Sequence, residues 1–312
     1  MTQRSMGAPT RDAFGEALLE LGAEDERIVV VDGDTIDSTR TKAFIDKFPS
    51  RGWNVGIAES NMVGIGAGLA ASGKIPFICS FAAFLMANAY DQIRMGVAFP
   101  GTNAKLIGSH GGISPGEDGP SQMAVEDLAL AGALGGVVVV VPSDANLARV
   151  LTKKIAAYEG PVYMRTGRPN APVIYEEPRD AELGKGITVA EGDDLCIIAN
   201  GLMVAEALTA AESLAEKGHS AEVIDMHTLK PLDQDAVRSA TQKRGIIVAE
   251  EHFGHGGLGS AVAMMVAEIS PTPIRFVNVG DRYSTSGQPE ELFEDSGITS
   301  ARILEKSLEL LS

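Results

Sequence analysis

Short runs of β-branched and other apolar residues alternate with helical stretches along almost the whole 312-residue chain. Near-continuous hydrophobicity of this kind is typical of parallel strands that are covered on both faces. In the first half the runs are "RIVVVD", "KIPFICS", "AKLIGS", "GVVVVVP" and "GPVYMR". Helices are expected between them, near residues 11–22, 59–72, 84–98, 123–132 and 144–158. This alternation predicts a doubly wound α/β domain.

The alternation stops at residues 167–186, where prolines and charged residues cluster and no periodicity is visible. A segment of this composition is typical of a linker. The pattern then restarts with "DDLCIIAN", "SAEVIDM", "RGIIVAEE" and "PIRFVNVG". The helices expected here lie near residues 202–217, 233–242, 256–269 and 298–311. We therefore predict two mainly parallel-sheet α/β domains, residues 1–180 and 181–312.

Charge and apolar content restrict the partners and the compartment. The 26 basic and 42 acidic side chains give a formal net charge of −16, which argues against nucleic acid or an anionic membrane as a partner. No apolar stretch reaches the ~18–20 residues of a membrane span, and the N-terminal residues lack the hydrophobic segment of a signal peptide. Cys79 and Cys196 lie in apolar runs, which favours buried reduced thiols, although their spacing leaves a disulfide open. These features predict a cytoplasmic protein.

A single acid, Glu59, stands at the start of a predicted helix in "NVGIAESNMVGIGAGLAASG". In open α/β sheets ligands bind outside the carboxyl ends of the strands, where this acid is expected. An acid in a first helical turn often only complements the helix dipole. Glycines that permit close approach and apolar surroundings that favour a shared proton point instead to a functional role. Phe81 and Phe84 follow the next strand, where they could pack in the core or sandwich a heteroaromatic ring.

Two more groups of polar side chains follow predicted strands. The loop "GSHGGISPGEDGPSQMAVEDL", residues 108–128, contains His110, Glu117 and Asp118. A glycine-rich loop of this length is either a solvated surface segment or a mobile, substrate-binding one. Arginines also follow strands or begin helices. Singly they could be solvated charges, and together they could bind a phosphate bidentately. They are Arg11, Arg40, Arg165 and Arg168.

Taken together, these segments resemble the C-terminal half of a transketolase, and more closely the separately encoded C-terminal subunit of a bacterial split transketolase. The matching motifs are "TRDAFGEAL", "NVGIAESNMVGIGAGLA", "SFAAFLMANAYDQIR", "GSHGGISPGEDGP" and "VIDMHTLKPLD", which follow one another over nearly the whole chain. The resemblance implies a pyrimidine-binding domain followed by the transketolase C-terminal domain, with thiamine diphosphate as cofactor. It also implies the transfer of a two-carbon ketol unit from a ketose or ketose phosphate to an aldose.

The resemblance further implies roles for individual residues. Glu59 matches the family's essential glutamate, whose carboxyl bonds a ring nitrogen of the aminopyrimidine and so activates the cofactor. Phe81 and Phe84 fall where family aromatics contact that pyrimidine. The remaining matched positions would bind the hydroxyls or the phosphate of the sugar. They are Arg11, Ser38, His110, Asp118, Gln122, Arg165 and Arg168.

The chain departs from the family pattern in two places. It lacks the Gly-Asp-Gly that, with a downstream Asn, holds the Mg²⁺ of the diphosphate through oxygen ligands. We therefore expect no metal ligands here and an N-terminal transketolase subunit that supplies them, in an assembly with two copies of each chain. Ser121-Gln122 stands where the family usually has Thr-His. Because a neutral amide cannot carry a charge or shuttle a proton, the donor specificity should differ from the usual one.

Other functions fit part of the pattern. The β subunit of a 2-oxoacid dehydrogenase shares both domains and the acid, and a deoxyxylulose-phosphate-synthase-like enzyme is usually one longer chain. The "GISPGEDGP" loop favours transketolase over both. A non-catalytic scaffold subunit would not need Glu59, both phenylalanines and Asp118. A nucleotide-binding module would need a glycine-rich phosphate loop after the first strand, which "VVVDGDTIDS" matches poorly.

Overall fold

The first of two large sheets has seven strands, in the spatial order β12-β6-β7-β5-β4-β2-β3. The structure is a computed structural model that describes residues 4–312. Six neighbouring strands of this sheet run parallel. They are β2 (Ile28–Asp32), β3 (Gly52–Asn54), β4 (Ile75–Phe81), β5 (Lys105–Ser109), β6 (Val138–Val140) and β7 (Val162–Arg165).

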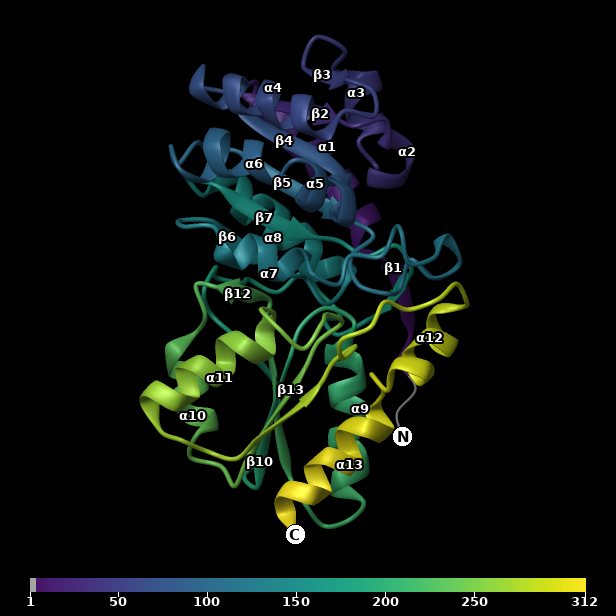
Figure 1. The fold of residues 1–312 in the computed structure, drawn as a ribbon, viewed down its shortest axis with the longest axis vertical. Helices are drawn as coiled ribbons and strands as arrows, with labels where there is room; N and C mark the ends of the chain where they lie inside the picture. Colours follow the sequence, from purple (N-terminus) through teal and green to yellow (C-terminus); the bar gives the residue numbers. More distant parts are fainter. Residues whose placement is uncertain (1–3) are drawn as a thin grey trace.

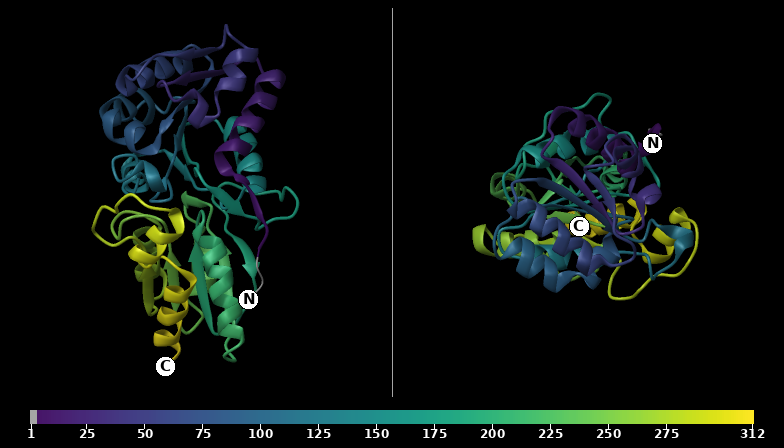
Figure 2. Two further views of the ribbon diagram at one scale, coloured as in Figure 1. Left: turned by 90° about the vertical axis from the view of Figure 1, so that its right-hand side faces the viewer. Right: turned by 90° about the horizontal axis from the view of Figure 1, so that it is seen from above.

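Helices cover both faces of this sheet (Figures 1 and 2). Side chains alternate along β2, so Val30 packs with α1 and α8, whereas Val31 packs with α4 and α5. On the first face lie α1 (Thr10–Glu24), α3 (Lys42–Lys47) and α8 (Ala145–Ala157). On the second lie α4 (Glu59–Ala71), α5 (Ala82–Asn88) and α7 (Asp127–Ala133). Shorter elements are α2 (Ile36–Thr39), α6 (Tyr90–Gln92), a π-helix (Ile93–Ala98) and a 3₁₀-helix (Gly116–Asp118).

A five-stranded sheet forms the second half, in the order β14-β13-β10-β11-β9, with only β9 antiparallel. Its strands are β9 (Ile187–Ala190), β10 (Leu195–Ala199), β11 (Ala221–Asp225), β13 (Ile246–Ala249) and β14 (Ile274–Val277). Its helices are α9 (Met203–Ala215), α10 (Gln234–Ala240), α11 (Leu258–Ile269), α12 (Pro289–Ser296) and α13 (Ser300–Leu311). The two halves stack along the long axis (Figure 2). The prediction of two mainly parallel-sheet α/β domains is confirmed.

The two halves are connected more closely than the sequence indicates. Strand β12 (Thr228–Lys230), from within the predicted second domain, pairs antiparallel with β6 at the edge of the first sheet. Strand β1 (Met6–Pro9) pairs with β8 (Asn170–Pro172), which lies within the predicted linker. One buried apolar cluster runs from β4 of the first sheet to β10 and β13 of the second. The two halves on either side of the predicted boundary at 180/181 therefore share an apolar interface, and the second half contributes one strand to the first sheet.

Local differences from the predicted elements have physical causes. The helix predicted at 84–98 is divided at Ala89 into α5, α6 and the π-helix. The helix predicted at 123–132 begins at Asp127, because residues before it belong to a long loop. Both cysteines are buried and free, which confirms the predicted thiols. Within residues 4–312, no helix combines the length and the apolar character needed to cross a bilayer.

Candidate functional site

Glu59 is the first residue of α4, at the carboxyl edge of the first sheet. Its side chain is only 6% exposed. No donor in the described part of the chain hydrogen-bonds to its carboxylate, although the N-terminal end of α4 favours negative charge. The neighbouring Ser60 hydroxyl donates to the Asn88 carbonyl at 2.9 Å and ties the start of α4 to the end of α5. The carboxyl is thus held in place by its helix and left available for a ligand.

Three rings stack beside the ends of β4 and β5. The Phe81 and Phe84 rings are nearly parallel, 5.4 Å apart, and His110 stacks on Phe81 at 3.9 Å. A ligand ring between two parallel rings would need about 7 Å of separation. The idea that Phe81 and Phe84 sandwich a ligand is therefore wrong for this geometry, and an edge or outer face of Phe84 is what remains for contact.

His110 is held as a neutral imidazole by its neighbours. Nε2 lies 3.3 Å from an Arg11 amino group, which can only donate, so Nε2 accepts and Nδ1 carries the proton. Nδ1 lies 2.8 Å from the Ser109 hydroxyl, which completes the pair of contacts. Burial and then the charges of Arg11, Arg168 and Arg40 lower the pKa of His110 to about 3. The ring is therefore uncharged at neutral pH.

The basic side chains gather around this imidazole. Arg11 donates to the Ser38 carbonyl at 3.2 Å, and its buried Nε has no hydrogen-bond partner among residues 4–312. Arg168 donates to the Pro115 carbonyl at 2.8 Å and pairs with Asp118 at 3.7 Å. Burial and the nearby charge of Arg40 lower the pKa of Arg11. Asp12 pairs with Arg40 at 2.6 Å and lies 3.7 Å from the Arg11 Nε, so an acid of the chain already balances part of this charge. The remaining guanidinium donors suit a phosphate.

A buried acid that the sequence analysis missed shapes the loop after β2. The Asp32 carboxylate is fully buried and accepts from the Thr35 backbone N–H at 2.7 Å and from the hydroxyls of Thr39 and Thr41 at 2.6 and 2.8 Å. These bonds fold residues 33–41 so that the Ser38 carbonyl meets Arg11. The available signal was an acid at the end of an apolar strand, followed by three threonines within nine residues.

Arg165 does not join this group. Its guanidinium is buried and pairs with Asp127, and it also donates to the carbonyls of Glu251 and Ala124 at 2.9 and 3.1 Å. A Cβ on Gly111 would overlap the Arg165 side chain, so the backbone passes directly over it. Because each of its nitrogens is engaged within the protein, Arg165 is not placed to bind the sugar phosphate predicted for it. It supports instead the loop that carries His110.

Gln122 lies near the end of the same loop, partly buried. Its side-chain oxygen accepts from the Ser121 hydroxyl, and its backbone N–H donates to the Gly119 carbonyl at 3.1 Å. Among the described residues, no hydrogen bond joins Gln122 to the cluster around Arg11 and His110. Its predicted substrate contact stays a prediction.

Known proteins share both halves of this architecture. Residues 6–173 match the model of the transketolase pyrimidine-binding domain, and residues 184–303 match that of the transketolase C-terminal domain. The chain belongs to the transketolase family. The similarity extends to separately encoded subunits, so the predicted resemblance to split C-terminal subunits is confirmed.

Three relatives show how specific the transketolase similarity is. The 6-deoxy-6-sulfo-D-fructose transketolase subunit SqwH of Clostridium sp. (strain MSTE9) is 41% identical over 96% of this chain and 94% of its own. A subunit of the apulose-4-phosphate transketolase of Phocaeicola vulgatus is 37% identical, over 96% and 97%. A solved split gene transketolase, described as an inactive beta4 tetramer, matches with a TM-score of 0.91 at 41% identity, over 98% and 99%.

The outer side of α4 is an open flank of the candidate site. Gly64 and Gly68 lie exposed on this helix, and no atom lies near the position a Cβ would take on either. Large apolar side chains stand beside the helix: Ile57 and Phe99 are each 82% exposed, and Met95 is 50% exposed. Helix α4 is at the end of the molecule away from the second domain (Figure 1). Exposed apolar side chains grouped in this way are typical of an interaction site.

Among the residues that the structure describes, no metal site accompanies the candidate cluster. Across residues 4–312, no group of three or more His, Cys, Asp or Glu side chains is placed to hold a metal ion. The Mg²⁺ ligands therefore stay a prediction for a partner chain.

Proposed function

We propose that this chain is the C-terminal subunit of a two-chain, thiamine-diphosphate-dependent transketolase that transfers a two-carbon ketol unit from a ketose or ketose phosphate to an aldose. The observation that carries the proposal is the buried Glu59 carboxyl, without a donor in the described chain, at the sheet edge shared with the phenylalanines and the guanidinium cluster. The family membership supports the same chemistry.

The residues present fit the pyrimidine half of thiamine diphosphate. When bound, this cofactor supplies a nucleophilic carbon and an electron sink. Glu59 would hold a proton against a ring nitrogen, because its carboxyl has no competing partner in the part of the chain that the structure describes. Phe84, with Phe81 behind it, would contact the ring by an edge or outer face. The diphosphate and its Mg²⁺ would be held by the partner.

The guanidinium cluster would bind the phosphate or other anionic end of the sugar. Arg11 and Arg168 supply charge, and the neutral His110 holds Arg11 in place through its Nε2. Asp118, already paired with Arg168, would accept from a sugar hydroxyl, and Ser38 lies within the same group. Arg165 is assigned to loop support and not to substrate.

The donor is proposed to differ from the usual ketose phosphates of the pentose phosphate pathway. Gln122 replaces the expected histidine, and it offers only neutral hydrogen bonds to the transferred unit. The related subunits named for 6-deoxy-6-sulfo-D-fructose and apulose-4-phosphate support a family branch with varied substrates.

The partner is proposed to be an N-terminal transketolase subunit that carries the Gly-Asp-Gly motif, in a cytoplasmic assembly with two copies of each chain. The subunit names of the relatives and the inactive tetramer formed by a similar chain support this division of the active site. The exposed apolar flank of α4, next to Glu59, is the surface where this chain would meet the partner.

The test is to assay the chain alone and with the product of a neighbouring open reading frame that encodes Gly-Asp-Gly. We expect no turnover alone, and ketol transfer from a ketose phosphate in the complex with Mg²⁺ and thiamine diphosphate. A panel of ketoses and pyruvate separates this activity from that of a 2-oxoacid dehydrogenase β subunit. Oxidative decarboxylation of pyruvate without ketol transfer, or full activity of the chain alone, would contradict the proposal.

A further inference from the structure

The loop of residues 110–126, which carries His110 and Asp118, is built into the second domain. Three apolar side chains of the loop are buried in the core cluster that α9, α13 and β13 form in the second half. They are Ile113, Met123 and Val125. The loop begins after a strand of the first sheet and yet takes its apolar contacts from the second domain. Its position therefore depends on both halves.

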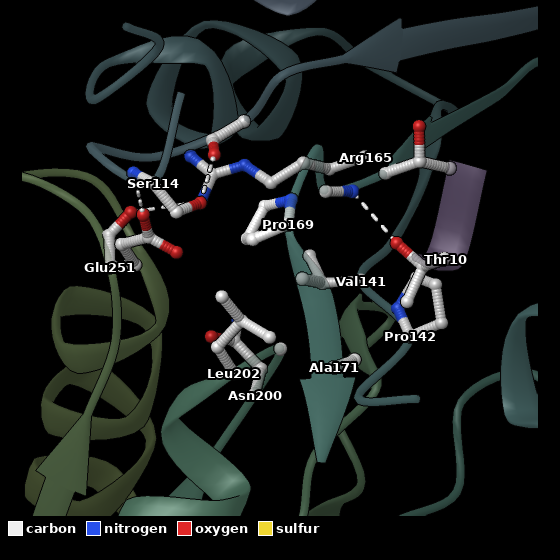
Figure 3. Close-up of a pocket in the computed structure, with 14 residues that line it drawn as sticks. Thr10, Ser114, Val141, Pro142, Arg165, Pro169, Ala171, Asn200, Leu202 and Glu251 are labelled. Atoms are coloured by element: carbon white, nitrogen blue, oxygen red, sulfur yellow. Dashed lines mark hydrogen bonds between the residues drawn. The ribbon is translucent and has the colours of Figure 1, made fainter. Parts of the chain in front are cut away.

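Glu251, the second residue after β13, makes the central polar contact to this loop. Its carboxylate accepts from the Ser114 backbone N–H at 2.5 Å, and its carbonyl accepts from Arg165 at 2.9 Å (Figure 3). A Cβ on Gly112, where φ is +75°, would overlap the Glu251 carboxylate, so the loop backbone lies directly against it. The Glu251 side chain is 7% exposed. One residue of the second domain thus holds both the loop and the arginine beneath it.

The residues next to Glu251 continue the contact. The Phe253 backbone N–H donates to the Val125 carbonyl at 2.8 Å. His252 Nε2 accepts from the Ala129 N–H at 3.3 Å, at the start of α7. Farther along, the Gln288 amide donates to the Glu117 carboxylate at 2.5 Å. Segment 251–253 therefore fixes the interior and the C-terminal end of the loop.

Glu251 does not reach the substrate side of the loop. The space that it lines with Asn200, Thr166 and Arg165 is a cavity of about 30 Å³ between the two domains (Figure 3). A cavity of this size holds water molecules and not a sugar. The buried Asn200 amide nitrogen and Thr166 hydroxyl have no protein partner among the described residues, as expected where water completes the bonding. Any effect of Glu251 on catalysis must therefore pass through the loop.

We propose that Glu251 is a positioning residue through which the second domain holds the substrate-binding loop in its working conformation. The proposal rests on the proposed function only in taking the loop as substrate-binding. The Ser114 N–H bond fixes the middle of the loop, and the adjacent 3₁₀-helix, Gly116–Asp118, carries Asp118 toward Arg168. The C-terminal domain, which supplies no part of the Glu59 group, would act on the substrate in this way.

The first test uses amide hydrogen exchange of the isolated chain. In Glu251→Ala we expect exchange in residues 111–118 to rise at least tenfold, with strands β2 to β5 unchanged. Glu251→Gln keeps an oxygen acceptor for Ser114 and should restore protection. The matched control is Glu250→Ala, because this neighbouring buried acid bonds the backbone N–H groups of Leu258 and Gly259 at 2.6 and 2.7 Å. It should loosen the start of α11 and leave the loop protected.

The second test measures steady-state kinetics in the complex with the partner subunit. Glu251→Ala should raise the KM of a phosphorylated donor about tenfold and change kcat less than threefold, whereas Glu250→Ala should leave KM unchanged. Unaltered loop exchange in Glu251→Ala, or equal loop exchange in the control, would overturn the positioning role. Raised exchange with unchanged KM would overturn its link to substrate. Absence of transketolase turnover in the wild-type complex would count against the proposed function and leave the exchange result to decide on positioning.

Discussion

The two ends of the proposed site differ in how far the chain's own residues bury them and hydrogen-bond to them. At the loop end, residues 110–126 are largely buried, hydrogen-bonded by Glu251 and packed into the second domain's core. At the Glu59 end, the carboxyl has no protein donor within residues 4–312, and the adjoining flank of α4 exposes Ile57, Met95 and Phe99. The chain thus orders the proposed substrate-binding side by itself and leaves the proposed cofactor-binding side for another surface to cover.

In the proposed two-chain enzyme, this difference would divide the binding of substrate and cofactor between the chains. A substrate-binding loop must be ordered to define specificity, and here one polypeptide orders it with both of its domains. A cofactor shared between chains requires a surface that is stable alone and still favourable to cover. Small residues on α4 and exposed side chains beside it provide such a surface. Substitutions at either end should therefore have different consequences.

The largest loss of activity is expected for a substitution of Glu59. Glu59→Gln keeps the shape of the side chain but cannot share a proton with a ring nitrogen, so activity of the complex should fall at least a hundredfold, or ~2.7 kcal/mol of transition-state stabilisation. Stability of the isolated chain should change little. Hydrogen–deuterium exchange at the cofactor's reactive carbon is the direct measurement. An unchanged exchange rate would show that another residue activates the cofactor and that Glu59 only complements the dipole of α4.

Binding of the partner chain should depend on the exposed apolar side chains beside α4 and not on those elsewhere on the surface. Ile57→Glu places a charge where the partner is expected to bury this surface, so we expect the complex to dissociate at least tenfold more readily. The isolated variant should unfold within about 0.5 kcal/mol of the wild type, because the side chain is exposed. Binding is measured by titration of the partner chain. The control is Met264→Glu on α11, at a position that is 70% exposed. Equal losses of partner affinity in the two variants would show that the flank of α4 is not the specific partner surface.

The parts of this molecule that were predictable from sequence are those dictated by local patterns. Hydrophobic periodicity identified β2, β4, β5 and β7 within a residue or two, because buried parallel strands leave continuous apolar runs. Strand β12 was missed because "TLK" is too short to show a period, and its pairing with β6 depends on how the two halves dock. Family motifs supplied Glu59 and the phenylalanines, whereas the stacking of His110 on Phe81 required coordinates.

The site residues that sequence reasoning misjudged are those whose partners are distant in the chain. Arg165 was assigned to phosphate as a basic residue after a strand, but Asp127 and the Glu251 carbonyl occupy its nitrogens. Glu251 lay in the predicted strand "RGIIVAEE" without any signal of its own. In the sequence, Gly111 and Gly112 suggest a mobile loop. The structure shows instead that each glycine makes room for a buried charged side chain beneath the loop.

A smaller effect is expected from Gln122, which lies in the ordered loop. Gln122→His should change donor preference roughly ten- to a hundredfold, because one charge-capable hydrogen bond in a partly dry site is worth ~1.5–3 kcal/mol. The measurement is kcat/KM for xylulose 5-phosphate and a panel of ketoses and 2-oxoacids. If the wild type already uses xylulose 5-phosphate at full efficiency and the variant matches it, Gln122 is a neutral replacement.

The pH dependence of stability tests whether His110 stays neutral in the folded chain. In the unfolded chain this histidine binds a proton below its ordinary pKa of 6.5, whereas burial and the arginines lower its pKa in the folded chain to about 3. Between these values the unfolded state binds more protons, so the free energy of unfolding falls as the pH is lowered, by at most about 1.4 kcal/mol per pH unit. His110→Gln cannot titrate. The urea midpoint of the wild type minus that of the variant should therefore decrease from pH 6.5 to pH 4 and stay constant from pH 7.5 to pH 8.5. If this difference in urea midpoint grows on acidification, the imidazole becomes charged in the folded loop. The contacts of His110 would then hold it less firmly in its neutral form than the structure indicates.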